Sequence, residues 1–233
     1  MKDLSKVTLL AIDNTNRIEG TIKAIYTSTQ KINFGDVKIL TSFEHKEKYE
    51  GELGIDNIKI EVLNSKISNI DEYSRYVLYE LYQHVDTEFV LLIQDHGFVI
   101  NPEAWTDEFL EYDYVGAPWP YSKNSYVTPF GEHIGVGNGG FSLRSQRILK
   151  TPLEVNIPFD CTKGEFYKHF NANNYAEDGN ICVHNRHLFI ENGCKFCPLE
   201  LAVTFSYEKS IPENVGIIPF GFHYNLPPGV TLE

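Results

Sequence analysis

The feature that most constrains the fold is a run of five apolar residues, 89–93, which stops abruptly at Gln94-Asp95-His96-Gly97. A continuous apolar run of this length is typical of a β-strand buried on both faces, as in a parallel sheet covered by helices. Parallel strands deliver the residues that follow them to the carboxyl edge of the sheet, where open α/β folds bind ligands. A plain strand-to-turn junction is the alternative, because Asp and Gly are ordinary turn residues.

The first hundred residues alternate between strand and helix patterns. Strands are predicted at residues 7–12, 37–40, 58–63 and 89–93. Helices are predicted after Thr15 or Asn16 and at the capping box Asn69 to Glu72, and their apolar spacing assigns Tyr26 and Ile70 to buried faces. This β-α-β-β-α-β order predicts an α/β fold, a single domain with a mainly parallel central sheet flanked by helices.

Length and composition limit the class of protein. The chain has 233 residues, 42% of them hydrophobic, so it can bury a sizeable core in one domain. Its formal net charge of −12 argues against a nucleic-acid partner, which would normally meet a basic face. No apolar run approaches the ~20 residues of a membrane span, and no apolar leader is seen at Met1. We therefore expect no transmembrane segment and a cytoplasmic protein.

Polar residues follow the first predicted strand at the same edge of the sheet as residues 94–97. Asp13 and Asn14 precede the first helix, and a nucleotide there could meet the N-terminus of that helix. Arg17 is placed to reach a phosphate or a base, with an ordinary solvated helix residue as the equal alternative.

The second half of the chain begins with an aromatic and proline-rich segment, residues 112–120. Trp119 within it is a good stacking surface for a sugar ring, or equally a core tryptophan under a loop. Residues 135–140 contain four glycines, which neither helix nor ordinary strand favours. So many glycines directly before a strand favour close approach of a ligand, although the segment lacks the lysine of a P-loop and a generic turn is possible.

Three further sites each have a functional and a purely structural interpretation. Glu177-Asp178 opens a predicted helix, either as simple capping or as a catalytic carboxylate ready to take a proton from a hydroxyl. His223 lies in an apolar segment and is interpreted as a core histidine unless the chain returns it to the loop at Asp95. The motif Cys194-x-x-Cys197 lacks a second pair, so reduced, buried thiols are favoured over a zinc or redox site.

Taken together, these segments resemble a family of glycosyltransferase-like proteins of unknown function with the nucleotide-sugar transferase (GT-A) fold. The resemblance extends from about residue 6 to 225 and rests on Gln94-x-x-Gly97, residues 112–119 (Tyr-Asp-Tyr-Val-Gly-Ala-Pro-Trp), residues 136–144 (Val-Gly-Asn-Gly-Gly-Phe-Ser-Leu-Arg), Glu177-Asp178 and residues 219–223 (Pro-Phe-Gly-Phe-His). It implies a nucleotide-binding half at residues 1–100 and an acceptor and catalytic half at residues 101–233.

The order of these motifs is also similar to that of the β-1,4-galactosyltransferases. That similarity implies a divalent metal, Mn²⁺ or alternatively Mg²⁺, bound by Asp95, His96 and His223, and a base at Asp178 or, as second choice, Glu177. His96 stands where the family pattern has an aspartate, which tilts the site toward softer metals.

The function implied is metal-dependent transfer of a sugar from a nucleotide-diphosphate donor to an acceptor hydroxyl, with inversion and retention both left open. A UDP-sugar is the expected donor and a glycan or other hydroxyl compound the acceptor. The expected donor-binding residues are Asp13, Asn14, Arg17, Gln94, Gly139 and Gly140, and Trp119 is the expected acceptor contact. The alternatives are an inactive nucleotide-sugar or glycan-binding module on the same fold and, ranked last, a zinc hydrolase.

Overall fold

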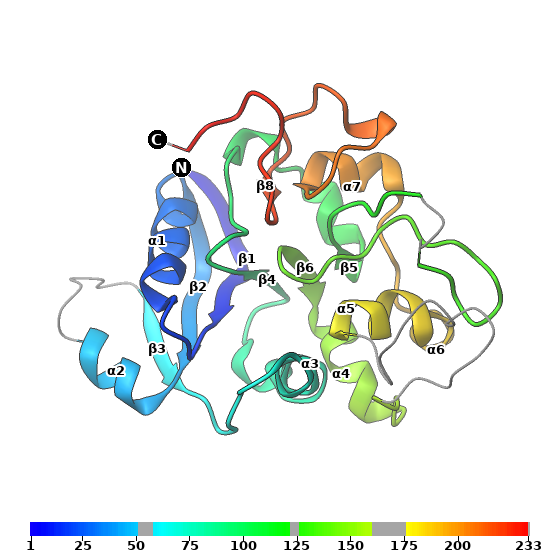
Figure 1. Cartoon of the computed structure of the whole chain (residues 1–233). Coiled ribbons are helices and arrows are strands. Elements are labelled where there is room, and N and C mark those ends of the chain that lie inside the picture. The colour runs from blue at the N-terminus through cyan, green and yellow to red at the C-terminus, as the bar shows by residue number, and fades with distance from the viewer. Residues whose placement is uncertain (51–57, 122–125, 160–175, 233) are drawn as a thin grey trace.

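The structure is a computed structural model that describes residues 1–50, 58–121, 126–159 and 176–232. Its strands are β1 (Lys2–Ile12), β2 (Ile32–Thr41), β3 (Lys59–Val62), β4 (Phe89–Ile93), β5 (Tyr114–Val115) and β6 (Ser142–Ser145). They form one six-stranded sheet in the order β3-β2-β1-β4-β6-β5 (Figure 1). The first four strands in this order are parallel, and β6 runs antiparallel to β4 and β5. The predicted α/β class with a mainly parallel central sheet is confirmed.

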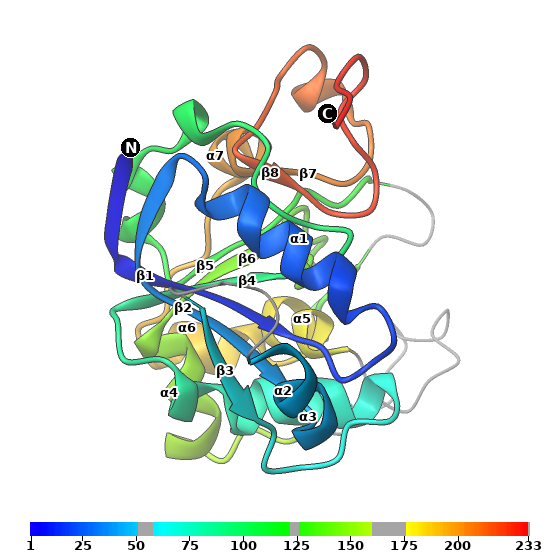
Figure 2. The same cartoon turned by 90° about the vertical axis from the view of Figure 1, so that its left-hand side faces the viewer.

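Helices cover both faces of this sheet. The helical segments are α1 (Ile18–Thr29), α2 (Phe43–Tyr49), α3 (Ile70–Tyr79), η1 (Leu81–His84), η2 (Pro102–Ala104), η3 (Asp107–Glu111), α4 (Gln146–Glu154), α5 (Glu177–Gly179), η5 (Asn180–His184), α6 (Arg186–Glu191), α7 (Leu199–Phe205) and η6 (Pro212–Asn214). A small second sheet pairs β7 (Ser206–Tyr207) with β8 (Gly221–Phe222). Figure 2 shows α1, α7 and the β7–β8 sheet on one face and α3 and α4 on the other.

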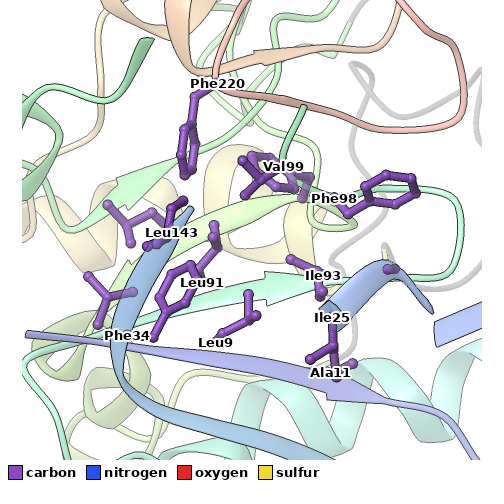
Figure 3. Packing of buried hydrophobic residues seen from close by; sticks show 14 of the residues in the cluster. Leu9, Ala11, Ile25, Phe34, Leu91, Ile93, Phe98, Val99, Leu143 and Phe220 are labelled. Atoms are coloured by element: carbon purple, nitrogen blue, oxygen red, sulfur yellow. The ribbon is translucent and has the colours of Figure 1, made fainter. Parts of the chain in front are cut away.

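The strand β4 is buried on both faces, as its apolar run predicted. Leu91 and Ile93 pack on the face that α1 covers, together with Phe220 from the C-terminal part of the chain (Figure 3). Val90 and Leu92 point the other way and pack in the cluster that α3 and α4 complete. Each such side chain contributes on the order of 1.5–3 kcal/mol when fully buried, which makes β4 the centre of the core.

Two side chains that apolar spacing assigned to the core are exposed, so those predictions were wrong. Tyr26 is 62% exposed and Ile70 is 63% exposed. In α1, small residues such as Thr21 and Ser28 complete the buried stripe, which turns Tyr26 outward. Ile70 is the first residue of α3, where the helix extends beyond the sheet and lines a cavity.

The strand β2 begins at Ile32, before the predicted residues 37–40, and it contains a buried lysine. Lys38 is 4% exposed and its ammonium lies 3.1 Å from Glu61, 3.4 Å from Asp86 and 3.5 Å from Asp36. Burial lowers the pKa of Lys38, but the hydrogen bond and charge of Glu61 and the charges of the other carboxylates raise it overall. The lysine thus remains charged inside the sheet.

The connections create a crevice at the carboxyl edge of the sheet. The chain leaves β1 through α1 to β2 on one side, and it enters β4, on the other side of β1, after α3. Neighbouring strands whose connections lead to opposite faces mark a topological switch point, where open α/β folds bind ligands. Residues 13–17 and 94–97 therefore meet outside the ends of β1 and β4.

Two smaller predictions concern cysteines and membranes. Cys182, Cys194 and Cys197 are buried free thiols, as predicted for the Cys-x-x-Cys motif, while Cys161 lies outside the described residues. No helix in the described part of the chain is both long enough and apolar enough to cross a membrane.

Candidate active site

A cavity of about 310 Å³ opens at the switch point between β1 and β4. Three segments line most of it: residues 12–17 after β1, residues 67–73 at the start of α3, and Gln94 to His96 after β4. Its volume is at the lower end of the range of about 300–1,000 Å³ typical of small-molecule sites. A larger hollow of about 730 Å³ lies at the opposite edge, beside residues 85–89, and includes Tyr112 and Asp113 but none of the residues predicted to bind donor, acceptor or metal or to act as the base.

The loop after β1 is ordered by its own side chains. The Asp13 carboxylate accepts hydrogen bonds from the Thr15 backbone N–H at 2.8 Å and from the hydroxyls of Thr15 at 2.7 Å and Thr21 at 2.6 Å. The Asn14 amide donates to the Ile67 carbonyl at 2.6 Å. These two predicted donor-binding side chains therefore line the cavity while holding its wall in place.

Arg17 is the more available group of this loop. Its side chain is 59% exposed, and its guanidinium lies 3.5 Å from the Asp95 carboxylate across the mouth of the cavity. Among the described residues that line the cavity, Arg17 is the only lysine or arginine. An exposed ion pair of this kind contributes about 0–1 kcal/mol, so an incoming anion can displace Asp95 with little loss of free energy.

The turn after β4 presents Asp95 and His96 at its tip. Gln94 and Gly97 exchange backbone hydrogen bonds of 3.0 and 3.1 Å, which closes the chain into a tight hairpin turn. The Asp95 carboxylate is hydrogen-bonded to Nδ1 of His96. Burial lowers the pKa of His96, although Asp95 opposes this effect. A lowered pKa keeps the imidazole neutral near pH 7.

His223, which follows β8, returns to this turn. Its ring is 7% exposed, and its centroid lies 5.0 Å from that of His96. Nε2 of His223 lies 3.3 Å from Gln94 Oε1, while Nδ1 lies 3.1 Å from Asn138 Nδ2 and 3.4 Å from Glu208 Oε1. The tertiary fold thus brings together the late histidine and the β4 turn, which are far apart in the sequence.

The three predicted metal ligands are neighbours, but their donor atoms face protein partners. Asp95 is bonded to His96 and faces Arg17, and both nitrogens of His223 contact other side chains. Across residues 1–50, 58–121, 126–159 and 176–232, no group of three or more His, Cys, Asp or Glu side chains is arranged to hold a metal ion. As arranged here, these residues do not fit a metal, and its use remains a prediction.

The glycine-rich segment approaches protein side chains very closely. A Cβ atom at Gly139 would collide with the Glu177 carboxylate, and one at Gly140 would collide with the ring of His223. The glycines therefore bring the backbone against both parts of the candidate site. Contact of Gly139 and Gly140 with a donor remains a prediction, since the observed neighbours are the chain's own acid and histidine.

We expect Gly140→Ala to displace His223 and to weaken any ligand binding in the cavity. The added methyl overlaps the imidazole, and overpacking of this kind costs about 1–3 kcal/mol of folding free energy. Urea unfolding and the NMR signals of His223 measure both effects. Gly135→Ala is the matched control in the same segment, because a Cβ there meets no atom within 4 Å. Equal stability of the two variants would contradict the expectation.

The acid pair at the start of α5 has two different environments. Glu177 is 4% exposed, and its carboxylate accepts a hydrogen bond of 2.9 Å from Arg144, a fully buried arginine of β6. Asp178 is partly exposed; its carboxylate accepts from the backbone N–H of Gly139 at 2.9 Å and of Gly179 at 2.7 Å. The charge of Glu177 is thus neutralised by a partner, while Asp178 has only backbone donors.

These environments favour Asp178 over Glu177 for the predicted role of base. Burial of the carboxylate, followed by the charge of Glu177, raises the pKa of Asp178 to about 6, against the lowering effect of the two backbone donors. A general base works best when its pKa is near the working pH. Enzymes often give two neighbouring carboxyl groups different roles by placing them in different environments.

A π-helical turn, η5, follows the acid pair where an ordinary helix was expected. The Asn185 backbone N–H donates to the Asn180 carbonyl five residues earlier at 2.9 Å, and the two side-chain amides are joined at 3.0 Å. Both amides also donate to the Pro158 carbonyl at 3.1 Å. Single π-turns are frequent at functional sites. Apolar periodicity does not reveal this π-helical turn, because its only trace in the sequence is a pair of asparagines five residues apart.

Trp119 is packed rather than presented to solvent. It is 8% exposed, its ring stacks on Tyr126 at a centroid distance of 4.0 Å, and Gly137 lies against it. This favours the core interpretation of Trp119. Its predicted role as an acceptor contact remains a prediction, now with little exposed ring surface available for it.

Solved structures with a similar fold include two of LgtC. A structure of an active-site mutant of LgtC is 13% identical and aligns with a TM-score of 0.53 over 94% of this chain and 88% of that chain. The galactosyltransferase LgtC in complex with donor and acceptor sugar analogues is 12% identical, with a TM-score of 0.52 over 93% and 86%. The mannosyltransferase PcManGT from Pyrobaculum calidifontis, in complex with GDP-Man and Mn²⁺, is 11% identical and aligns at 0.44 over 82% and 53%.

At these identities, the two LgtC structures show a shared GT-A glycosyltransferase fold. No curated protein matches the sequence. Residues 57–223, most of the chain, match the family described as "Protein of unknown function (DUF5672)". The protein therefore belongs to the DUF5672 family, on the GT-A fold.

Proposed function

We propose that the protein is a glycosyltransferase that moves a sugar from a nucleotide-diphosphate donor to an acceptor hydroxyl. The observation that carries the proposal is the cavity at the β1–β4 switch point with a carboxylate of raised pKa, Asp178, nearby. Gln94 in the cavity wall contacts His223, which abuts Gly140, and the adjacent Gly139 donates to Asp178. The fold is similar to that of LgtC, a galactosyltransferase solved with donor and acceptor sugar analogues.

In the proposed reaction, Asp178 takes the proton of the acceptor hydroxyl. The acceptor oxygen forms a bond to the anomeric carbon, and the bond from that carbon to the diphosphate breaks with its electron pair leaving on the nucleoside diphosphate. A single base opposite the leaving group implies inversion at the anomeric carbon. Arg17 is placed to pair with the diphosphate once Asp95 is displaced. Positioning of donor and acceptor next to the base supplies much of the acceleration in reactions of this type.

The charge of the cavity supports the proposal of a divalent cation, Mn²⁺ or Mg²⁺. The carboxylates of Asp13 and Asp95 line it, and a diphosphate there would meet a single basic side chain among the described lining residues, Arg17. Because the predicted ligands are engaged with protein groups, we propose that the cation enters with the diphosphate of the donor. The expected donor is a UDP-sugar, and the expected acceptor is a glycan or other hydroxyl compound.

We expect one nucleoside diphosphate, UDP first, to raise the melting temperature, and more strongly with Mn²⁺. A ligand at 100 times its Kd stabilises the folded state by about 2.7 kcal/mol, which thermal shift detects. A panel of UDP-, GDP-, CMP- and dTDP-sugars identifies the nucleobase of the donor.

Arg17→Gln is expected to weaken binding of the nucleoside diphosphate roughly tenfold, which corresponds to the loss of about one charge-assisted hydrogen bond.

The matched control is Arg147→Gln, because Arg147 is similarly exposed, at 57%, and lies at the opposite edge of the sheet. Binding that Arg17→Gln and Arg147→Gln weaken equally would contradict the placement of the diphosphate. No shift with any donor, with or without Mn²⁺, would overturn the proposed function.

The second candidate is a nucleotide-sugar or glycan-binding module without catalysis. It is favoured by His96, which stands where the related pattern has an aspartate, and by the engagement of its Nδ1 with Asp95. Donor binding without release of nucleoside diphosphate, even with a broad set of hydroxyl acceptors, would establish this reading.

A further inference from the structure

Tyr73 of α3 lines the cavity, on a helix that packs against α5, which carries the acid pair. Its side chain lines the cavity, and its hydroxyl oxygen accepts a hydrogen bond of 3.4 Å from Gln94 Nε2. The charges of Glu177 and Asp178 act on the same hydroxyl, and α3 packs against α5. Tyr73 thus lines the space proposed for the nucleotide, and its hydroxyl lies within electrostatic range of the carboxylate proposed as the base.

Gln94 holds the Tyr73 hydroxyl in position. The Gln94 amide uses its Nε2 toward Tyr73 and its Oε1 toward His223 at 3.3 Å, so one side chain links the two residues. Tyr73 accepts in its bond with Gln94, so its own proton remains to be donated. Within the described ranges, no protein acceptor bonds that proton.

The Tyr73 hydroxyl remains protonated across the physiological range. Burial, followed by the charge of Glu177, raises its pKa well above the ordinary value. A neutral O–H is therefore available as a donor in a region where carboxylates of Asp95, Glu177 and Asp178 predominate. A negatively charged ligand group placed there needs donors of this kind, and Arg17 is the only basic side chain among the described lining residues.

We infer that the Tyr73 hydroxyl donates a hydrogen bond to the diphosphate of the donor, at the oxygen that becomes the leaving group. The inference rests on the proposed function. The breaking bond must lie between the nucleotide in the cavity and the acceptor at Asp178, and Tyr73 lines that cavity on the helix that packs against α5. As that bond breaks, its electron pair goes to the diphosphate oxygen, the acceptor proton goes to Asp178, and Tyr73 keeps its proton. A preorganised donor at a developing charge stabilises the transition state.

Tyr73→Phe tests this role, because the ring and its packing are kept and only the hydroxyl is lost. We expect kcat to fall on the order of 10²-fold, as for removal of one preorganised donor. We also expect the Kd of the nucleoside diphosphate to rise about tenfold, the loss of about one charge-assisted hydrogen bond. The Kd of the matching nucleoside, which lacks phosphates, is expected to stay unchanged. Isothermal titration calorimetry gives both dissociation constants.

Tyr76→Phe is the matched control on the same helix. The Tyr76 hydroxyl bonds His84 Nε2 at 2.7 Å in the interior, away from the cavity, so its removal tests the general effect of losing a buried hydroxyl from α3. If the wild type binds the nucleoside diphosphate and Tyr73→Phe has the same Kd and the same kcat, the inference is overturned and the proposed function stands. If Tyr73→Phe raises the Kd of the nucleoside as much as that of the nucleoside diphosphate, the inference is also overturned. Absence of nucleotide binding to the wild type would overturn both.

Discussion

Asp178→Asn is expected to abolish sugar transfer while donor binding stays intact. An amide cannot take the acceptor proton, and loss of a positioned general base lowers the rate by about 10²–10⁴-fold. Because the pKa of Asp178 is raised to about 6, wild-type kcat/KM is expected to fall as the pH drops through that value, and the variant is expected to lack this limb. Release of nucleoside diphosphate measured from pH 5 to 8 gives both profiles, within the span over which a group of such pKa titrates.

The free energy of unfolding shows whether Asp178→Asn loses activity because the base is gone or because the protein unfolds. The folded-state pKa of Asp178 is above its ordinary value, so the folded chain binds more protons than the unfolded chain at intermediate pH. The ionised carboxylate therefore opposes folding at neutral pH, and stability rises as the pH falls toward the unfolded pKa. Asp178→Asn removes this effect, but its single amide oxygen can accept from only one of the two backbone N–H groups, so we expect the two effects to offset and the protein to stay folded at pH 7. Retained turnover in a folded Asp178→Asn protein would rule out Asp178 as the base.

Arg144→Met is expected to lower the free energy of unfolding by about 3–5 kcal/mol, the effect of removing one partner of a buried ion pair. Arg144 is fully buried, and its guanidinium donates to Glu177 at 2.9 Å and to the Ser142 hydroxyl at 3.0 Å. Without it, Glu177 stays as an unpaired buried carboxylate beside Asp178. Urea unfolding at pH 7 measures the loss directly.

The double variant Arg144→Met/Glu177→Met tests the cause. Replacing both partners by apolar side chains removes the unpaired charge, so we expect much of the stability to return. Arg147→Met is the control, because Arg147 is 57% exposed and lies 3.9 Å from Asp113; an ion pair this long with a solvated arginine contributes about 0–1 kcal/mol. A loss in Arg144→Met no larger than that of the control would contradict a structural role for the buried pair.

The chain's local patterns were sufficient for the class of fold and for the main segments of the site. The apolar run of β4 needs cover on both faces, which only a helix-covered sheet provides, and the structure confirms that arrangement. The polar residues after β1 and β4 were predicted to share an edge, because parallel strands end together, and they do. These inferences depend on properties that neighbouring residues carry by themselves.

Local patterns failed where a partner distant in sequence decides the outcome. The ammonium of Lys38 lies in the sheet because carboxylates from three other positions surround it, which no period of two reveals. Tyr26 was misplaced for a different, local reason: small polar residues of the same helix complete the buried stripe, and a count of apolar residues alone overlooks them.

The sequence by itself therefore determined the α/β class, the strand that centres the core, and the two loops and the acid pair from which the site is built. Only the tertiary structure decided how those parts act on one another. It pairs Arg144 with Glu177, leaves Asp178 with backbone donors and a raised pKa, and joins Tyr73 to Gln94 in the wall of the cavity. The physical reason is that charge balance, burial and hydrogen-bond partners depend on distances in space, which segments far apart along the chain acquire only on folding.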